Sequence, residues 1–179
     1  MMKLSFEESR NCWCIADTHF DHANIIKYCD RKFQDIEEMN NIILTNWNAN
    51  IKRDDLVFFL GDLVFGRCSR SPKDWLKLLN GRIIYLKGNH DRDMELTSQR
   101  LDNILFVTDF LRVNIESLPL LMIHDPQKVN NWDNWKVHGH THNREGDLFI
   151  NWETMKINVS VEIIDYKPIN LYSLVQMIL

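Results

Sequence analysis

Five times in this chain, a cluster of Asp, Asn or His residues stands directly after a short apolar run. The clearest case is the run from Leu56 to Leu60, which is followed at once by Gly61 and Asp62. Such a run predicts a buried strand, and a carboxylate at its end would be costly to bury without a partner or a metal ion. The repetition constrains the fold to strands whose ends deliver polar side chains to one place.

The other four clusters share this arrangement and the same few residue types. They are Asp17 with His19, then Asn89 with His90 and Asp91, then His124, and finally His140 with His142. In α/β sheets, sites form beyond the carboxyl ends of the strands, so these side chains are expected to meet. Seven Asp, Asn and His ligands at strand ends predict one site for two metal ions.

The expected elements place these clusters in a layered α/β or α+β domain. Helices are expected from Asp35 to about Asn48, with Asp35 as the cap, and from Ser71 to Leu79. A last short helix is expected after Asn170. Strands are expected at residues 13–16, 56–60, 83–86, 104–115, 120–123, 136–137 and 156–164.

Composition limits the kind of protein this is. A chain of 179 residues with 45% hydrophobic content predicts a single domain over residues 1–179. No apolar stretch reaches the roughly 20 residues of a membrane span, and the four cysteines form no C-x-x-C pair, so we expect a soluble, cytoplasmic protein. The net charge of −4 disfavours electrostatic binding along a nucleic-acid backbone, but it does not exclude a local binding site for one phosphate group.

In their order along the chain, the five motifs resemble those of the calcineurin-like metallophosphoesterases. The resemblance extends from Asp17 to His142, and the segments Asp17 to Lys27 and Asn158 to Ile169 resemble the small, uncapped bacterial and phage members. It implies a four-layer αββα sandwich of two mixed β-sheets flanked by helices. It also implies a hydrolase that cleaves phosphodiester bonds through a dinuclear metal centre and a metal-bridging hydroxide.

The resemblance further implies how the two ions are held, with Asp62 shared between them. The first ion would take Asp17, His19, Asp62 and His142, and the second would take Asp62, Asn89, His124 and His140. Manganese is expected first, and iron, zinc or nickel are alternatives, because mixed nitrogen and oxygen ligation does not select among them. His90 is the candidate general acid by its motif position.

A few other residues bear on the substrate. His22 and Arg67 are candidate substrate contacts. Asp91 either orients His90 or serves a solvent-exposed turn. Asp21 and Ser160 stand where small members commonly have glycine, which leaves hydrolysis expected but substrate choice open.

Other functions remain as alternatives. Within the enzymes these are a phosphomonoesterase, a nucleotide pyrophosphatase or a nuclease, the last disfavoured by the acidic balance. A metal-binding interaction scaffold would be expected to lose His90 or Asp62, and both are present. A structural zinc site is usually closed, four-coordinate and often contains cysteine. The expected partner is a small phosphoester or nucleotide-type substrate. The sequence gives no strong signal for nucleic-acid binding, no membrane interaction is expected, and the oligomeric state is not predicted.

Overall fold

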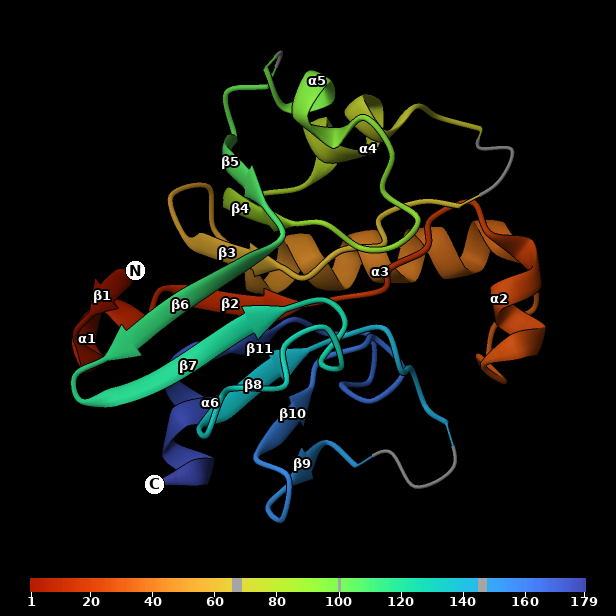
Figure 1. Cartoon of the computed structure of the whole chain (residues 1–179). Coiled ribbons are helices and arrows are strands. Elements are labelled where there is room, and N and C mark those ends of the chain that lie inside the picture. The colour runs from red at the N-terminus through yellow and green to blue at the C-terminus, as the bar shows by residue number, and fades with distance from the viewer. Residues whose placement is uncertain (66–68, 100, 145–147) are drawn as a thin grey trace.

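The computed structural model describes residues 1–65, 69–99, 101–144 and 148–179. Two mixed β-sheets lie face to face, and helices flank them (Figure 1). The predicted sandwich of two mixed sheets with helices outside is therefore confirmed. That the whole chain forms one domain stays a prediction.

Within the described residues, the first sheet has five strands, and its neighbours from β2 to β5 run parallel. These strands are mainly apolar, as expected where both faces of a sheet are covered. A short strand joins one edge antiparallel to β2. The order across this five-stranded sheet is β11 (Ile169–Asn170), β2 (Cys12–Ile15), β3 (Leu56–Phe59), β4 (Arg82–Leu86) and β5 (Ile104–Thr108).

The second sheet has six strands in the same described ranges, and it mixes parallel and antiparallel neighbours. Strands β7 and β8 are parallel, as are β8 and β10, whereas β6 and β7 form an antiparallel pair. The order across this six-stranded sheet is β1 (Met2–Leu4), β6 (Phe110–Ile115), β7 (Leu118–Ile123), β8 (Trp135–His138), β10 (Lys156–Asn158) and β9 (Ile150–Asn151).

Helices cover the outer face of the five-stranded sheet. The longest, α3 (Ile36–Asn50), begins at the predicted cap Asp35, whose carboxylate accepts the Glu38 N–H. Helix α4 (Pro72–Leu78) begins at the predicted cap Ser71. Two shorter helices, α2 (Ala23–Tyr28) and α5 (Met94–Ser98), complete this side (Figure 1).

Two more helices flank the edge of the sandwich near β1 and β11 (Figure 1). The C-terminal helix α6 (Leu171–Ile178) is capped by Asn170 as predicted, and it contacts β2 and β11. The short helix α1 (Phe6–Ser9) packs against β1 and α6. The apolar face of α6 closes the core between the sheets at this edge, because Leu174 and Val175 are fully buried there.

Strand β3 shows how one strand serves two layers of the core. Val57 and Phe59 belong to the apolar cluster that contains α3, while Phe58 belongs to the cluster between the sheets. Successive side chains of a strand point to opposite faces, so an uninterrupted apolar run fills both layers. The run therefore fixes β3 in the centre of the fold and its carboxyl end at the site described below.

Two predicted strands are wrong in their extent. Residues 104–115 form two strands in different sheets, because the chain turns at Asp109 from β5 into β6. The strand predicted at 156–164 ends at Asn158, and residues 161–166 form turns in which Asp165 and Tyr166 have positive φ. Apolar alternation continues across both breaks, so the pattern alone does not reveal them.

The structure shows the state of the cysteine side chains and whether any helix could span a membrane. Cys12, Cys14 and Cys29 are buried and free, whereas Cys68 lies outside the described residues. Within the described part of the chain, no helix is long and apolar enough to cross a membrane.

Trp47→Ala is expected to lower the free energy of unfolding by about 3–5 kcal/mol, because it opens a cavity beneath α3 and removes a hydrogen bond. The Trp47 side chain is fully buried, and its indole N–H donates to the Asn80 carbonyl oxygen at 2.9 Å. Urea unfolding of the metal-free protein measures the loss. The matched control is Trp152→Ala, at a residue that is 60% exposed, and equal losses in the two variants would contradict this packing.

Candidate metal centre

The carboxyl ends of the strands bring the predicted ligands together. Strands β2, β3 and β4 are parallel, so the segments that follow them leave the same edge of the five-stranded sheet. Strands β7 and β8 are parallel in the facing sheet, and they end on the same side of the sandwich as β2 (Figure 1). All five polar clusters therefore lie at one end of the two sheets.

Three of the ligands predicted for the first ion form a compact group. Asp17, His19 and His142 each offer one ligand atom, and these atoms lie within 4.8 Å of one another. Asp17 is fully buried and His19 is nearly so. The fourth predicted ligand, Asp62, approaches this group through Oδ2, which lies 3.6 Å from His19 Nε2.

The ligands predicted for the second ion converge on Asn89. Its side-chain oxygen lies 3.0 Å from His124 Nε2 and 2.7 Å from His140 Nδ1. His124 Nδ1 lies 2.7 Å from the Leu60 carbonyl oxygen, which can only accept a hydrogen bond. The proton of neutral His124 is therefore on Nδ1, and Nε2 keeps the lone pair that a metal ion needs.

One oxygen atom lies between the two groups. Asp62 Oδ2 is 3.6 Å from His19 Nε2 in the first group and 3.4 Å from His124 Nε2 in the second. The other oxygen, Oδ1, accepts the backbone N–H of His90 at 2.9 Å. Asp62 thus presents one oxygen to both groups, which is the position that a carboxylate shared by two ions needs.

The backbone adopts the left-handed region at most of these residues. This region is uncommon for residues other than glycine, and such conformations cluster at functional sites. The five predicted ligands that adopt it are Asp17 (φ 59°), His19 (φ 46°), Asp62 (φ 59°), His140 (φ 70°) and His142 (φ 53°). The turns that follow the strands are therefore unusually tight, and the sequence pattern did not predict this.

Two glycines let the carboxylates pack against bare backbone. A Cβ atom on Gly88 would lie 2.0 Å from Asp62 Oδ1 and 2.6 Å from the Asp62 backbone nitrogen. A Cβ atom on Gly139 would lie 2.5 Å from Asp17 Oδ2. Any side chain at either position would displace a carboxylate, because these separations are far below van der Waals contact.

The donor atoms of the first group fit a divalent cation. Asp17 Oδ2 accepts the backbone N–H of His140 at 2.9 Å and the Ser160 hydroxyl at 2.7 Å. Among the described residues, Asp17 Oδ1 and both ring nitrogens of His19 are buried with no hydrogen-bond partner. Buried polar atoms are nearly always satisfied, so atoms left open in this way suit a metal ion.

Two imidazoles of the centre have pKa values above 7, so without a metal ion they carry a second proton and a positive charge at neutral pH. Burial alone would lower the pKa of His124, but the Asp62 carboxylate outweighs it and raises that pKa to about 9. Burial also opposes the protonation of His142, yet Cys29 and Glu162 raise its pKa to about 10. Burial would raise the pKa of Asp62, but His124 lowers it to about 2, so this carboxylate stays charged.

A buried ion pair supports the first group from behind. Glu162 Oε1 lies 3.0 Å from His142 Nδ1, and the guanidinium of Arg31 lies 2.6 Å from the same oxygen. Arg31 also donates to the backbone oxygens of Asp17 at 2.8 Å and Thr18 at 2.9 Å. A carboxylate that bonds the second nitrogen of a ligand histidine fixes the orientation of that ring.

The sequence pattern did not single out either member of this pair. Glu162 left no distinct signal, because Asn158, Ser160 and Glu162 occupy the polar positions of the alternating stretch from Ile157 to Ile163. Arg31 left none, since it follows α2 in a polar stretch and only the tertiary fold buries it.

The candidate general acid His90 lies at the rim of the centre. Its side chain is 35% exposed, and its Nε2 lies 4.0 Å from Asp62 Oδ2. The carboxylate of Asp91 accepts the backbone N–H groups of Asp62, Leu63 and Gly88 at 2.7, 3.2 and 2.8 Å. Asp91 therefore fixes the turn that carries Asp62, which differs from both roles expected for it.

Of the two predicted substrate contacts, only His22 lies within the described residues, and its role stays a prediction. The ring of His22 lies beside the centre, with its centroid 5.7 Å from that of His19, and Arg67 lies outside the described residues. Asp21 has a φ of 66°, which explains why glycine suits this position. Its carboxylate accepts the Trp75 indole N–H at 2.8 Å and the Ser69 hydroxyl at 2.8 Å, so it ties the turn to α4.

Comparison with known proteins identifies the group to which the chain is related. A sequence model of the family described as calcineurin-like phosphoesterase matches residues 11–165. An uncharacterised protein of Methanocaldococcus jannaschii is 40% identical over 174 residues, which cover 94% of this chain and 92% of that protein. The gene 66 protein of Mycobacterium phage D29 is 28% identical over 162 residues, covering 75% of this chain and 79% of that protein.

A solved structure shares the fold. The crystal structure of a protein of unknown function from Aquifex aeolicus has a TM-score of 0.71 and 28% sequence identity. The match covers 93% of this chain and 98% of that one. None of the names of these three proteins states an activity, so the chemistry has to be argued from the site itself.

Loading metal-free protein with Mn²⁺ or Zn²⁺ at pH 7.5 is expected to release about two protons, because His124 and His142 must give up theirs to bind an ion. Their pKa values of about 9 and about 10 lie above this pH, so metal affinity should rise as the pH approaches 9. Calorimetric titrations in buffers of different ionisation enthalpy count the protons. An enthalpy that is the same in every buffer would contradict these protonation states.

Glu162→Gln is expected to weaken binding of the first ion by about 10–100-fold, because His142 loses its charged partner. It should also lower stability by about 3–5 kcal/mol, since the Arg31 guanidinium is left buried and unpaired. Metal titration and urea unfolding measure the two effects. Glu37→Gln, at an exposed residue of α3, is the matched control, and wild-type affinity in Glu162→Gln would rule out the orienting role.

Proposed function

The chain belongs to the calcineurin-like phosphoesterase family, and from this premise we propose that it hydrolyses phosphodiester bonds with two divalent metal ions. Membership points to a hydrolase with a divalent-metal site. The diester substrate, the two-ion stoichiometry and manganese as the working metal are our proposal. Buried free thiols at Cys12, Cys14 and Cys29 suit a reducing compartment, so we also propose a cytoplasmic location.

The observation that carries the proposal is the position of Asp62 Oδ2. It lies within 3.6 Å of a nitrogen in each of the two ligand groups, and the Asp62 side chain is only 2% exposed. A single structural ion would need four ligands in a closed shell. Seven ligand residues, one of which is the shared carboxylate, instead suit a pair of ions.

Two divalent ions bound here would polarise a phosphoryl group from both sides and lower the pKa of a water molecule between them. The chain supplies the charge balance for this chemistry. Asp17 and Asp62 are the two carboxylates among the seven proposed ligands, so the loaded centre would keep a positive charge. That charge favours a phosphate anion and the further negative charge of its transition state.

His90 is suited to protonate the leaving oxygen. Its side chain is more exposed than those proposed to bind the first ion, such as Asp17 and His19. Its Nε2 lies 4.0 Å from Asp62 Oδ2, and His90 is not one of the proposed metal ligands. Its backbone N–H bonds to Asp62 Oδ1, which fixes the backbone of His90 beside the proposed ions, and its ring lies with its centroid 5.7 Å from that of His19. A proton donor in that place can neutralise an alkoxide as it leaves.

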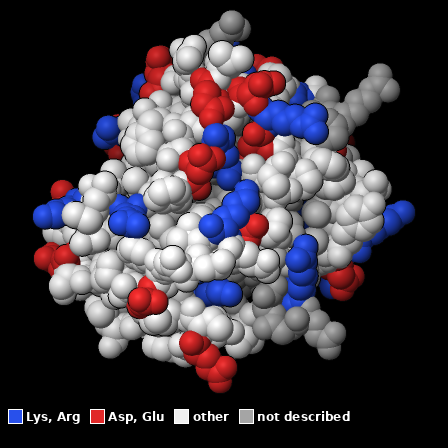
Figure 2. All heavy atoms as spheres, in the orientation of Figure 1, with Lys and Arg blue, Asp and Glu red and all other residues white. Residues whose placement is uncertain are grey.

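The surface favours a small substrate over a nucleic-acid duplex. On the face shown in Figure 2, acidic and basic side chains are interspersed, and the whole chain carries a net charge of −4. A protein that binds along a duplex backbone would be expected to carry a basic stripe. We therefore propose a small phosphoester or nucleotide-type ester, with a phosphomonoester or a pyrophosphate bond as the alternatives that a substrate panel distinguishes.

Protein loaded with Mn²⁺ is expected to hydrolyse bis-p-nitrophenyl phosphate, as measured by release of p-nitrophenol. His90→Ala should lower kcat by about 10²–10⁴-fold while both ions stay bound, because His90 donates a proton and is not a ligand. Asp62→Asn should lose activity together with metal, because the shared oxygen no longer carries a full charge. Metal analysis of the same samples separates the two cases. Wild-type protein that stays inactive with Mn, Ni, Co and Zn would contradict the proposed function.

A further inference from the structure

A row of four rings runs outward from the metal centre. The centroids of His90 and Phe65 are 4.3 Å apart, those of Phe65 and His22 are 4.6 Å apart, and those of His22 and Tyr28 are 6.1 Å apart. The rings come from the segments that follow β4, β3 and β2, so three strand ends contribute to one aromatic row. We use that name below for Tyr28, His22, Phe65 and His90.

The aromatic row is not part of the core. Phe65 is 38% exposed and Tyr28 is 74% exposed. At the rim of a charged metal centre, exposed rings that touch one another offer flat apolar surface to a ligand. The row is thus an apolar feature at a place where the proposed reaction itself needs polar groups.

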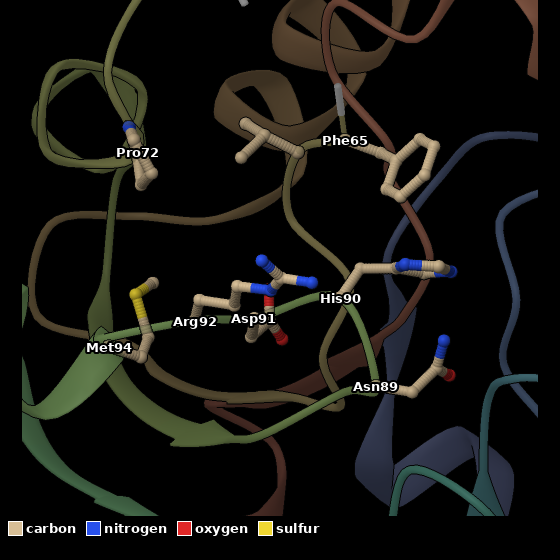
Figure 3. A pocket seen from close by; sticks show the side chains of 8 residues that line it. Phe65, Pro72, Asn89, His90, Asp91, Arg92 and Met94 are labelled. Atoms are coloured by element: carbon tan, nitrogen blue, oxygen red, sulfur yellow. The ribbon is translucent and has the colours of Figure 1, made fainter. Parts of the chain in front are cut away.

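Phe65 and His90, two members of the row, also line a pocket of about 370 Å³. Figure 3 shows Phe65 and His90 on one side of it and Pro72 and Met94 on the other, with the Arg92 side chain between them. Its size falls within the range of about 300–1,000 Å³ that small-molecule sites occupy. The pocket combines apolar walls with polar groups, among them the proposed proton donor His90 and the guanidinium of Arg92. Asp91 also lines it, but both oxygens of its carboxylate accept backbone N–H groups.

We propose that the aromatic row and this pocket form a subsite for a nucleobase, so that the substrate is a phosphoester of a nucleoside. The inference rests on the proposed function, because the phosphate would lie at the metal centre. The base would stack on Phe65, whose ring is inclined at 67° to that of His90. Arg92 adds a positive charge that suits a nucleotide and does not suit a neutral aliphatic group.

The chemistry of the subsite favours a base over the other common substituents of phosphoesters. A sugar phosphate offers hydroxyl groups, which gain nothing from the exposed ring of Phe65, whereas a base can stack on it. A lipid chain needs apolar surface but no flat ring and no cation. Stacking on an aromatic side chain is worth about 1–3 kcal/mol per base, so the subsite would discriminate by about fivefold or more.

The test compares adenosine 5′-monophosphate with ribose 5-phosphate, which carries a hydroxyl group where the nucleotide carries its base. Calorimetry on protein loaded with Mn²⁺ gives both Kd values without requiring turnover. We expect the adenosine ligand to bind about tenfold more tightly to the wild type. Phe65→Ala and Phe65→Leu should bring the ratio close to one, whereas Phe65→Trp should preserve it.

The matched control is Phe106→Ala, which removes an aromatic ring that is 41% exposed on β5, outside the site. Its ratio should equal that of the wild type. Equal affinities for the two ligands in the wild type would overturn the proposal, and so would a preserved ratio in Phe65→Ala. A ratio preserved in Phe65→Leu would mean that aliphatic contact suffices, which would also overturn it.

The two proposals fail separately. Protein that hydrolyses bis-p-nitrophenyl phosphate but binds both ligands equally keeps the proposed function and loses the nucleobase subsite. Protein that prefers the adenosine ligand through Phe65 but hydrolyses no phosphoester keeps the subsite and loses the proposed function.

Discussion

Two carboxylates buried at the ends of strands are the constraint on which the rest of the structure depends. Asp17 is fully buried and Asp62 is 2% exposed, and a charge at such depth is strongly unfavourable unless it is compensated. The compensation comes from imidazoles and backbone N–H groups that other strand ends supply. The two sheets must therefore stack so that their carboxyl ends coincide, and the site follows from that alignment.

The surrounding residues make the alignment rigid. Gly88 and Gly139 let backbone approach the two carboxylates, and Asp91 ties the Asp62 turn to the segment after β4. On the other side, Arg31 links the backbone at Asp17 to Glu162, which holds the ring of His142. Residues far apart in the sequence thus fix the positions of the proposed ligands. Such preorganisation lowers the cost of assembling a metal centre.

Much of the fold and of the candidate site could be predicted, because the sequence changes from apolar to polar residues where each buried strand ends. Apolar runs ending in Asp, Asn or His gave the sheet edges, and the caps Asp35, Ser71 and Asn170 gave three helix starts. The structure brings the seven predicted ligands together, and their roles as ligands stay a prediction. The left-handed backbone conformation of the ligand turns could not be predicted from the sequence. Glycine is the residue that indicates this conformation, and Asp and His occupy these positions instead.

Other features depend on tertiary contacts that no local pattern records. Arg31 is buried among partners distant in the sequence, including Glu162, which lies more than a hundred residues later. The aromatic row joins three segments whose rings are separately unremarkable in the sequence. The stretch from Ile104 to Ile115 kept its apolar character while the chain passed from one sheet to the other.

The most direct test of the account is anomalous diffraction from crystals of the protein grown with Mn²⁺. Two peaks are expected, roughly 3.5–4 Å apart, with Asp62 between them and Asp17 and Asn89 on opposite sides. A single peak, or a pair that does not share Asp62, would contradict the claim that these strand ends form a two-metal centre.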